Sequence, residues 1–222
     1  MATYMYYPRR TADAGGMILM PARKAGEENY VIKKLLLGTA LVFASSSVFA
    51  DGPSYNFIQV GYQEAKLDDD FFDIDGDGFG IGGSFEIAEN WFIIAGYSSL
   101  GFDFGVDLDQ LSVGGGYHVG ISDRTDVFAT LSYLSAEVSA SGFGSIDEDG
   151  YGVSVGLRSM LSDEFELNGS VGYSDLGDGA DGTAFGVGAL YSFTSNFAIG
   201  LNLGFEEDVT MYGVGARFYF GN

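Results

Sequence analysis

The 222-residue sequence has no cysteine, three prolines, one histidine, and only ten lysines and arginines against 31 acidic residues. The absence of cysteine excludes a disulfide framework and thiolate metal sites. The net charge of −21 argues against a nucleic-acid partner, because phosphate binding needs a basic surface. Few prolines, few charged residues and abundant Phe and Tyr are not the composition of a disordered chain. We therefore expect a folded protein that lacks disulfides and does not bind nucleic acid.

Residues 33–50 have the pattern of a secretory signal peptide. Lys33 and Lys34 form the positive start, residues 35–43 the apolar core, and Val48-Phe49-Ala50 a small-x-small cleavage site. The apolar run is too short for a membrane-spanning helix, which needs about 20 residues. Residues 1–32 show neither a strand nor a helix period, and we interpret them as a non-structural upstream extension. Cleavage near Ala50 would leave residues 51–222 as the folded domain.

The last strand sets the pattern for the rest of the chain. Alternate residues are apolar from Tyr212 to Phe220, and small or polar residues occupy most of the positions between them. Aromatic residues stand eight positions apart in this strand, and again at Phe165 and Tyr173 and at Phe185 and Phe193. Eight residues at ~3.3 Å each, tilted by ~40°, span about 20 Å along the membrane normal. This spacing is typical of an outer-membrane barrel with aromatic girdles at both interfaces.

The alternation predicts an all-β, closed antiparallel transmembrane barrel of about ten strands, or eight if short strands merge. The expected strands are 54–64, 78–87, 91–100, 106–120, 125–139, 150–160, 165–175, 183–193, 197–206 and 208–220. Tight polar turns are expected at 88–90, 122–124, 162–164 and 194–196. Longer loops rich in Gly and Asp are expected at 65–77, 101–105, 140–149 and 176–182, with a short one at 206–208. Short turns are periplasmic in such barrels, so both termini should lie on the periplasmic side.

The residues on the polar face decide which face meets lipid. This face is rich in small residues such as Gly80, Gly82, Ser84, Gly186 and Gly188. Such a row is too small and too uncharged for the exterior of a soluble barrel, but it fits a narrow lumen. We therefore expect the apolar face to contact lipid, which requires a closed sheet without free edges.

Six charged or titratable residues are predicted to gather in the lumen near the periplasmic mouth. Parity and strand direction place them there together: Glu86, His118, Asp126, Arg158, Glu166 and Arg217. Arg158 and Glu166 flank one turn and are expected to lie opposite each other. A structural floor that plugs the barrel is the first interpretation, and a gated conductance through the cluster is the alternative.

Asp73, Asp75 and Asp77 have the spacing that begins a calcium-binding loop. The twelfth position falls on Ser84, which cannot supply the bidentate carboxylate that such a loop requires. The expectation is no cofactor, with weak calcium binding in an acidic outer loop as the alternative. Enzymatic activity is not expected, because the only histidine lies at the turn end of its strand, where no outer-surface triad can form. No catalytic residues are assigned.

The residues from Asp51 onward resemble the small single-chain outer-membrane β-barrel proteins of Gram-negative bacteria, of the OmpA-transmembrane-domain and OmpX type. The most specific part is Gly215-Ala-Arg-Phe218-Tyr-Phe220, which is similar to the C-terminal insertion signal Gly-x-x-hydrophobic-x-aromatic. Two features depart from that pattern: Gly221 and Asn222 follow the final aromatic, and Gly213 replaces the usual polar residue. The resemblance implies the outer membrane as location, the barrel assembly machinery as a partner of the last strand, and lipid and lipopolysaccharide as neighbours.

The resemblance does not choose among the family's diverse roles. The first reading is a monomeric structural and surface-interaction protein with acidic outer loops. A narrow cation-preferring pore is the second, and a calcium-dependent adhesin acting through residues 73–78 is the third.

Overall fold

The computed structural model describes residues 52–69, 72–140, 144–177 and 180–221. The predicted upstream extension (1–32) and signal peptide (33–50) lie outside the described residues. No helix within these described ranges is long and apolar enough to cross a membrane.

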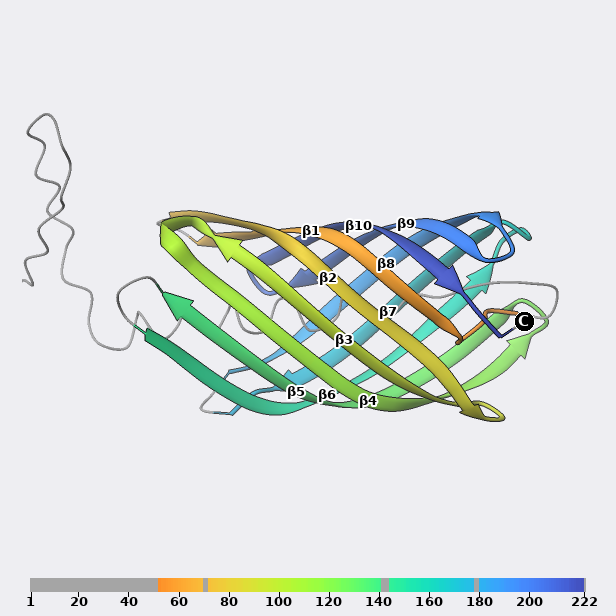
Figure 1. Cartoon of the computed structure of the whole chain (residues 1–222). Helices are drawn as coiled ribbons and strands as arrows, with labels where there is room; N and C mark the ends of the chain where they lie inside the picture. Colours follow the sequence, from red (N-terminus) through yellow and green to blue (C-terminus); the bar gives the residue numbers. More distant parts are fainter. Residues whose placement is uncertain (1–51, 70–71, 141–143, 178–179, 222) are drawn as a thin grey trace, which may run out of the picture.

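The described residues form ten antiparallel strands in a closed barrel (Figure 1), which decides between the predicted ten and the alternative eight. Each strand pairs with its neighbours in sequence, and β1 pairs with β10 to close the ring. A 3-10 turn, η1 (Asp103–Gly105), joins β3 and β4. The strands are β1 (Phe57–Asp69), β2 (Phe72–Ala88), β3 (Trp91–Phe102), β4 (Val106–Ser122), β5 (Thr125–Ala140), β6 (Gly144–Met160), β7 (Phe165–Asp175), β8 (Asp181–Thr194), β9 (Phe197–Glu206) and β10 (Val209–Tyr219).

The start of β1 and the end of β10 lie at the same end of the barrel (Figure 1). We assign this end to the periplasm on the basis of the sequence prediction, and call the opposite end the outer end. The closing pair β1–β10 is continuous from Phe57 opposite Tyr219 to Leu67 opposite Val209. Every strand therefore has a partner on both sides, which satisfies the backbone groups in hydrocarbon, where no water is available.

The apolar face of the strands points outward, as predicted. Ile58 is 51% exposed, whereas its neighbour Phe57 is 4% exposed and faces the lumen. On β5, Leu131 is 61% exposed between lumen-facing residues. Exposed aromatic side chains form two outward groups near the two ends of the apolar band. We call Tyr62, Phe79, Tyr97, Tyr133, Tyr151, Tyr173, Phe185, Phe205 and Tyr212 the outer girdle, and Phe85, Trp91, Tyr117, Tyr191, Phe193, Phe197 and Phe218 the periplasmic girdle.

The outer connections are shorter than predicted, which corrects the expectation of long outer loops. Strands β1 and β2 extend through most of the predicted loop 65–77, and β5 and β6 through most of the predicted loop 140–149. Pairing continues between Lys66 and Asp75 and between Glu137 and Asp147. The Gly- and Asp-rich composition suggested loops, but a paired strand satisfies the same backbone groups and lets its inner face pack.

Close approach between strands requires glycine at several positions, and Gly150 near the outer end of β6 is one of them. Gly150 lies on the inner face of β6, and a Cβ there would sit 1.9 Å from the backbone oxygen of Asp175. A side chain at this position would therefore push β6 and β7 apart, because a backbone oxygen cannot rotate away.

We predict that Gly150→Ala lowers the free energy of unfolding by about 1–3 kcal/mol, the usual cost of overpacking. Gly213→Ala is the matched control, because it also lies on the inner face but its Cβ would meet no atom closer than 3.7 Å. Urea unfolding in detergent micelles, followed by gel mobility, measures both variants. Equal stability of the two would contradict the close-approach argument.

Candidate functional site

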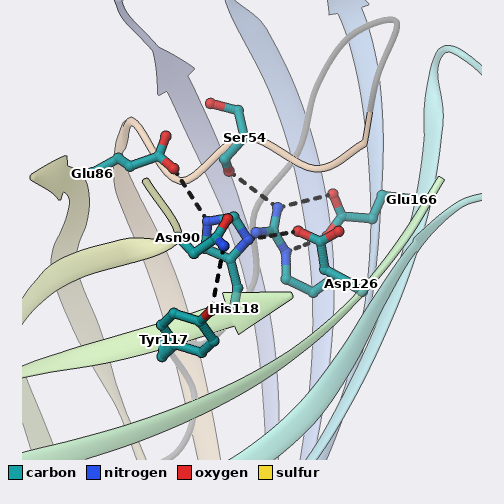
Figure 2. A network of polar contacts seen from close by, with 8 residues as sticks. Ser54, Glu86, Asn90, Tyr117, His118, Asp126 and Glu166 are labelled. Carbon is teal, nitrogen blue, oxygen red and sulfur yellow. Dashed lines mark hydrogen bonds and ion pairs between the residues drawn. The ribbon is translucent and has the colours of Figure 1, made fainter. Parts of the chain in front are cut away.

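The periplasmic end of the lumen brings together most of the predicted charge cluster (Figure 2). His118 on β4 lies between two carboxylates: its Nε2 is 3.2 Å from Glu86 Oε1, and its Nδ1 is 3.0 Å from Asp126 Oδ2. These three side chains come from β2, β4 and β5, so they tie together strands that are not all neighbours. Asp126 is 7% exposed and lies opposite Arg158 in the β5–β6 register.

Arg158 and Glu166 form a fully buried ion pair. The two side chains are 1% and 0% exposed, and Arg158 Nε donates to Glu166 Oε1 at 3.3 Å. The predicted pairing is correct but the predicted register is not, because Arg158 lies opposite Asn168 and Glu166 opposite Met160. The contact is therefore diagonal across the two strands, which is within reach of long side chains.

Arg217, the sixth residue of the predicted cluster, lies on β10 and contacts side chains of β1 and β10. Its guanidinium donates to Gln59 Oε1, with Nε at 3.1 Å. The guanidinium also lies over the ring of Phe57, 4.0 Å from its centroid, and 5.8 Å from the Tyr219 centroid. Two aromatic faces and an amide therefore hold this 2%-exposed cation.

The segment before β1 completes the periplasmic floor, a role that the sequence did not predict. Tyr55 is 3% exposed and lies in the lumen, where it stacks on His118 with ring centroids 3.9 Å apart. The Arg158 guanidinium covers the Tyr55 ring at 4.2 Å and also donates to the Ser54 carbonyl at 3.1 Å. Asn56 accepts from the Glu86 amide at 2.9 Å.

Residues 52–56 therefore plug the periplasmic mouth. These residues connect His118 and its two carboxylate partners with the Arg158–Glu166 ion pair. Sequence spacing alone does not link these two groups. A signal was present in the sequence, because Tyr55 and Phe57 are large aromatics with the parity of the lumen-facing positions.

The outer end of the lumen is closed by apolar side chains, a second feature that the sequence did not predict. We call this cluster the outer core. It consists of Ala65, Leu67, Leu100, Phe102, Leu108, Leu134, Ala136, Val138, Leu176, Ala180, Val209 and Met211, all 7% exposed or less. Its members lie on the inner face of strands that extend beyond the outer girdle, or in the β7–β8 connection. The apolar residues thus change from the outer to the inner face where the strands leave the membrane.

Between the two closures the lumen is lined by small polar residues. Thr130 and Ser154 hydroxyls bond across β5 and β6 at 2.6 Å. A cavity of about 30 Å³ lies along β1, β9 and β10, lined by residues that include Gln59, Gln63 and Asn202. This volume holds water but not an organic solute, since one water needs about 10–15 Å³ by the same measure.

The outside of the barrel beyond the outer girdle is acidic. We call this surface the outer wall. It carries Glu64, Asp75, Asp77, Asp107, Asp109, Glu137, Asp147, Asp149, Asp175 and Asp181 on outward-facing positions. Lys66 is the one basic residue on this part of the described strands, and it pairs with Glu64 at 3.2 Å.

Three tyrosines of the outer girdle donate hydrogen bonds to aspartates of the outer wall. The distances are 2.6 Å from Tyr97 to Asp109, 2.7 Å from Tyr133 to Asp149 and 3.2 Å from Tyr173 to Asp181. The bond from Tyr133 lowers the pKa of the exposed Asp149 carboxyl, because it stabilises the charged form. These hydrogen bonds hold the three aspartates just beyond the outer girdle.

The predicted calcium residues lie in β2 rather than in a loop, which corrects their expected conformation. Asp75 and Asp77 are exposed, and the side chain of Asp73 lies outside the described residues. Alternate residues of a strand stand roughly 6–7 Å apart and point the same way, whereas calcium ligands converge on one ion. Within the described residues, no group of three or more His, Cys, Asp or Glu side chains is placed to hold a metal. Calcium binding stays a prediction.

The predicted insertion signal lies at the end of β10 as expected. Phe218 is 55% exposed on the lipid face, and Phe220 stacks on Phe85 with ring centroids 6.2 Å apart. Gly215 lies opposite Gly61 in β1, where the ring closes. Recognition by the assembly machinery stays a prediction.

A closed antiparallel sheet with a lipid-facing apolar band and a polar lumen defines a transmembrane β-barrel. Residues 36–193 match the family model described as "Outer membrane protein beta-barrel domain", and the chain belongs to this family. It is therefore an outer-membrane protein of the Gram-negative type, as predicted.

The chain is also similar to individual outer-membrane proteins. It is 27% identical over 181 residues to the attachment invasion locus protein of Yersinia enterocolitica, covering 73% of this chain and 100% of the relative. An outer membrane channel from Pseudomonas putida F1 has the same fold, with 12% identity, a TM-score of 0.53, and coverage of 80% of this chain and 98% of the channel. The Ail protein of Yersinia pestis aligns with 19% identity and a TM-score of 0.40, over 75% of this chain and 100% of that one.

We predict that Arg158→Ala lowers the free energy of unfolding by about 3–5 kcal/mol, because it leaves the Glu166 carboxylate buried without its partner. The control is Arg124→Ala, which removes an exposed pair with Asp163 and should cost about 0–1 kcal/mol. Adding Glu166→Gln to Arg158→Ala should restore part of the loss. Urea unfolding in micelles measures all three, and equal losses in the two single variants would contradict the floor described above.

Proposed function

We propose that this protein is a non-conducting outer-membrane barrel with a structural and surface-interaction role. The observation that carries the proposal is that both ends of the lumen are filled, by residues 52–56 and the ionic floor at one end and by the outer core at the other. A solute would have to displace a buried ion pair and then an apolar core. The polar middle of the lumen favours the alternative of a narrow cation-preferring pore, but the cavity beside Gln59, Gln63 and Asn202 has room only for water.

The outer wall is the surface that we propose for interactions. Its paired strands hold the carboxylates on a folded sheet rather than on long loops, so a partner would meet a preorganised acidic surface. Similarity to a protein named for attachment and invasion is in keeping with this role. The surface is unsuited to polyanions, because like charges repel.

Lipopolysaccharide is the neighbour that we propose for the outer wall. Its phosphates are negative, so contact with these carboxylates requires divalent cations shared between lipid and protein. Cations held partly by lipid do not need a complete protein site, and such a site is not found among the described residues.

We propose no enzymatic activity. The relatives are outer-membrane barrel proteins. His118 lies in the periplasmic floor beneath Tyr55 and between two carboxylates, away from the outer surface. A signal peptide ending near Ala50 and a monomeric state complete the proposal.

Planar-bilayer recording tests the closed lumen. The purified barrel should show no single-channel steps, with a general porin recorded in the same membranes as the positive control. Arg158→Ala should also remain silent, because the outer core still blocks the other end. Steady cation-selective steps from the wild-type protein would establish the pore instead.

Chelation tests the contact with lipopolysaccharide. In vesicles that contain lipopolysaccharide and magnesium, EDTA should lower the apparent melting temperature of the barrel, and it should have no effect in vesicles without lipopolysaccharide. Asp107→Asn with Asp109→Asn should reduce the EDTA effect, whereas Glu89→Gln at a periplasmic turn should not. Without lipopolysaccharide, calorimetry should detect no saturable calcium binding. An EDTA effect that is the same in both kinds of vesicle would rule out the proposed contact.

A further inference from the structure

Glu206 is a carboxylate placed inside the outer core. It is the last residue of β9, one position beyond Phe205 of the outer girdle, and therefore lies outside the membrane-spanning part of the strand. Its side chain faces the lumen and is 6% exposed. Its register partners are Ala184 on β8 and Val209 on β10, each 5% exposed. An ionisable group thus occupies a position that otherwise belongs to an apolar cluster.

Neither carboxylate oxygen of Glu206 has a hydrogen-bond partner among the described residues. The neighbouring strands offer no titratable partner on the inner face at this level, since β8 presents Ala184 and β10 presents Val209 and Met211. Among the described residues at this end, the other charged groups are acidic apart from Lys66, which faces outward and pairs with Glu64. The acidic groups include those of the outer wall together with Glu207 and Asp208 on the β9–β10 turn and Glu148 on β6.

An ionised carboxylate without a partner is costly in an apolar environment, so the group retains its proton to a higher pH. Burial is the main cause, and the charge of Glu207 adds to it; together they raise the pKa of Glu206 to about 7. The neutral acid is therefore more stable than the carboxylate in this packed apolar environment.

We propose that Glu206 is a protonation-dependent latch of the outer core, in which the neutral acid lets β8, β9 and β10 pack tightly and the carboxylate loosens them. The sensitive part is the inner-face contact of Glu206 with Ala184 and Val209. The periplasmic floor lies at the opposite end and does not take part.

The direction of the effect follows from linkage. The folded-state pKa of Glu206 lies above the ordinary glutamate value of about 4.3, so folding of the outer core takes up a proton. The stabilisation of the folded outer core by protonated Glu206 is complete below about pH 4.3, and it is lost as the pH rises through about 7. The outer end should therefore be tight in acid and looser at alkaline pH.

Amide hydrogen exchange of the micelle-embedded barrel tests the latch. From pH 5 to pH 8, the protection factors of the amides at 209–211 should fall roughly 10- to 100-fold in the wild-type protein, after correction for intrinsic exchange. In Glu206→Gln, which keeps the shape but cannot ionise, protection at these amides should be nearly independent of pH and higher than wild type at pH 8.

Glu207→Gln is the matched control, because it changes the adjacent acid on the turn and leaves the buried one. It should keep the fall in protection, shifted to slightly lower pH, because loss of the Glu207 charge removes one of the two causes that raise the pKa of Glu206. Gel mobility confirms that each variant is folded before exchange is measured. The latch is refuted by pH-independent protection in the wild-type protein, or by a Glu206→Gln variant that loses protection as the wild type does.

Discussion

The structure depends on one constraint: in a closed sheet of alternating side chains, every residue faces either the lumen or the surroundings. The surroundings change from lipid to water where the strands pass the outer girdle. Leu131 faces lipid, and Glu137 and Val138 further along the same strand face water and the outer core, respectively. The apolar face therefore changes side within one continuous strand, and the strands that extend past the outer girdle continue the membrane barrel as a water-exposed extension with its own core.

This change of face explains why the two ends of the lumen are closed in different ways. Within the membrane, the apolar side chains are needed on the face that contacts lipid, so polar residue types occupy most of the positions that face the lumen. The floor is therefore built from charged groups, amides and a few aromatic rings. Such a floor is stable only when its charges are paired, as Arg158 is with Glu166 while the Tyr55 ring covers its guanidinium. Beyond the membrane the lumen can be filled as a soluble core is, with Leu, Val and Met side chains.

Much of the fold could be predicted because period 2 and the spacing of aromatics are local features of the sequence. Parity placed Glu86, His118, Asp126, Arg158 and Glu166 at one end, and the structure brings these five together. What sequence could not provide was lateral register, so Arg158 was expected directly opposite Glu166, whereas the two side chains meet diagonally. The outer hairpins were interpreted as loops because Gly and Asp are rare in strands, although Ala65, Leu67 and Val138 beside them had the parity of an inner core. The plug was not predicted because parity gives the face on which Tyr55 lies, but not that its ring meets His118 and Arg158 inside the mouth.

Labelling along β5 tests the change of face most directly. The chain has no cysteine, so single cysteines at 131, 137 and 138 can each carry a spin label in the membrane-embedded protein. We expect the label at 131 to collide with oxygen dissolved in lipid, the label at 137 with a water-soluble nickel chelate, and the label at 138 with neither. A label at 131 that is reached by the chelate, or one at 138 that is reached by either reagent, would contradict the account.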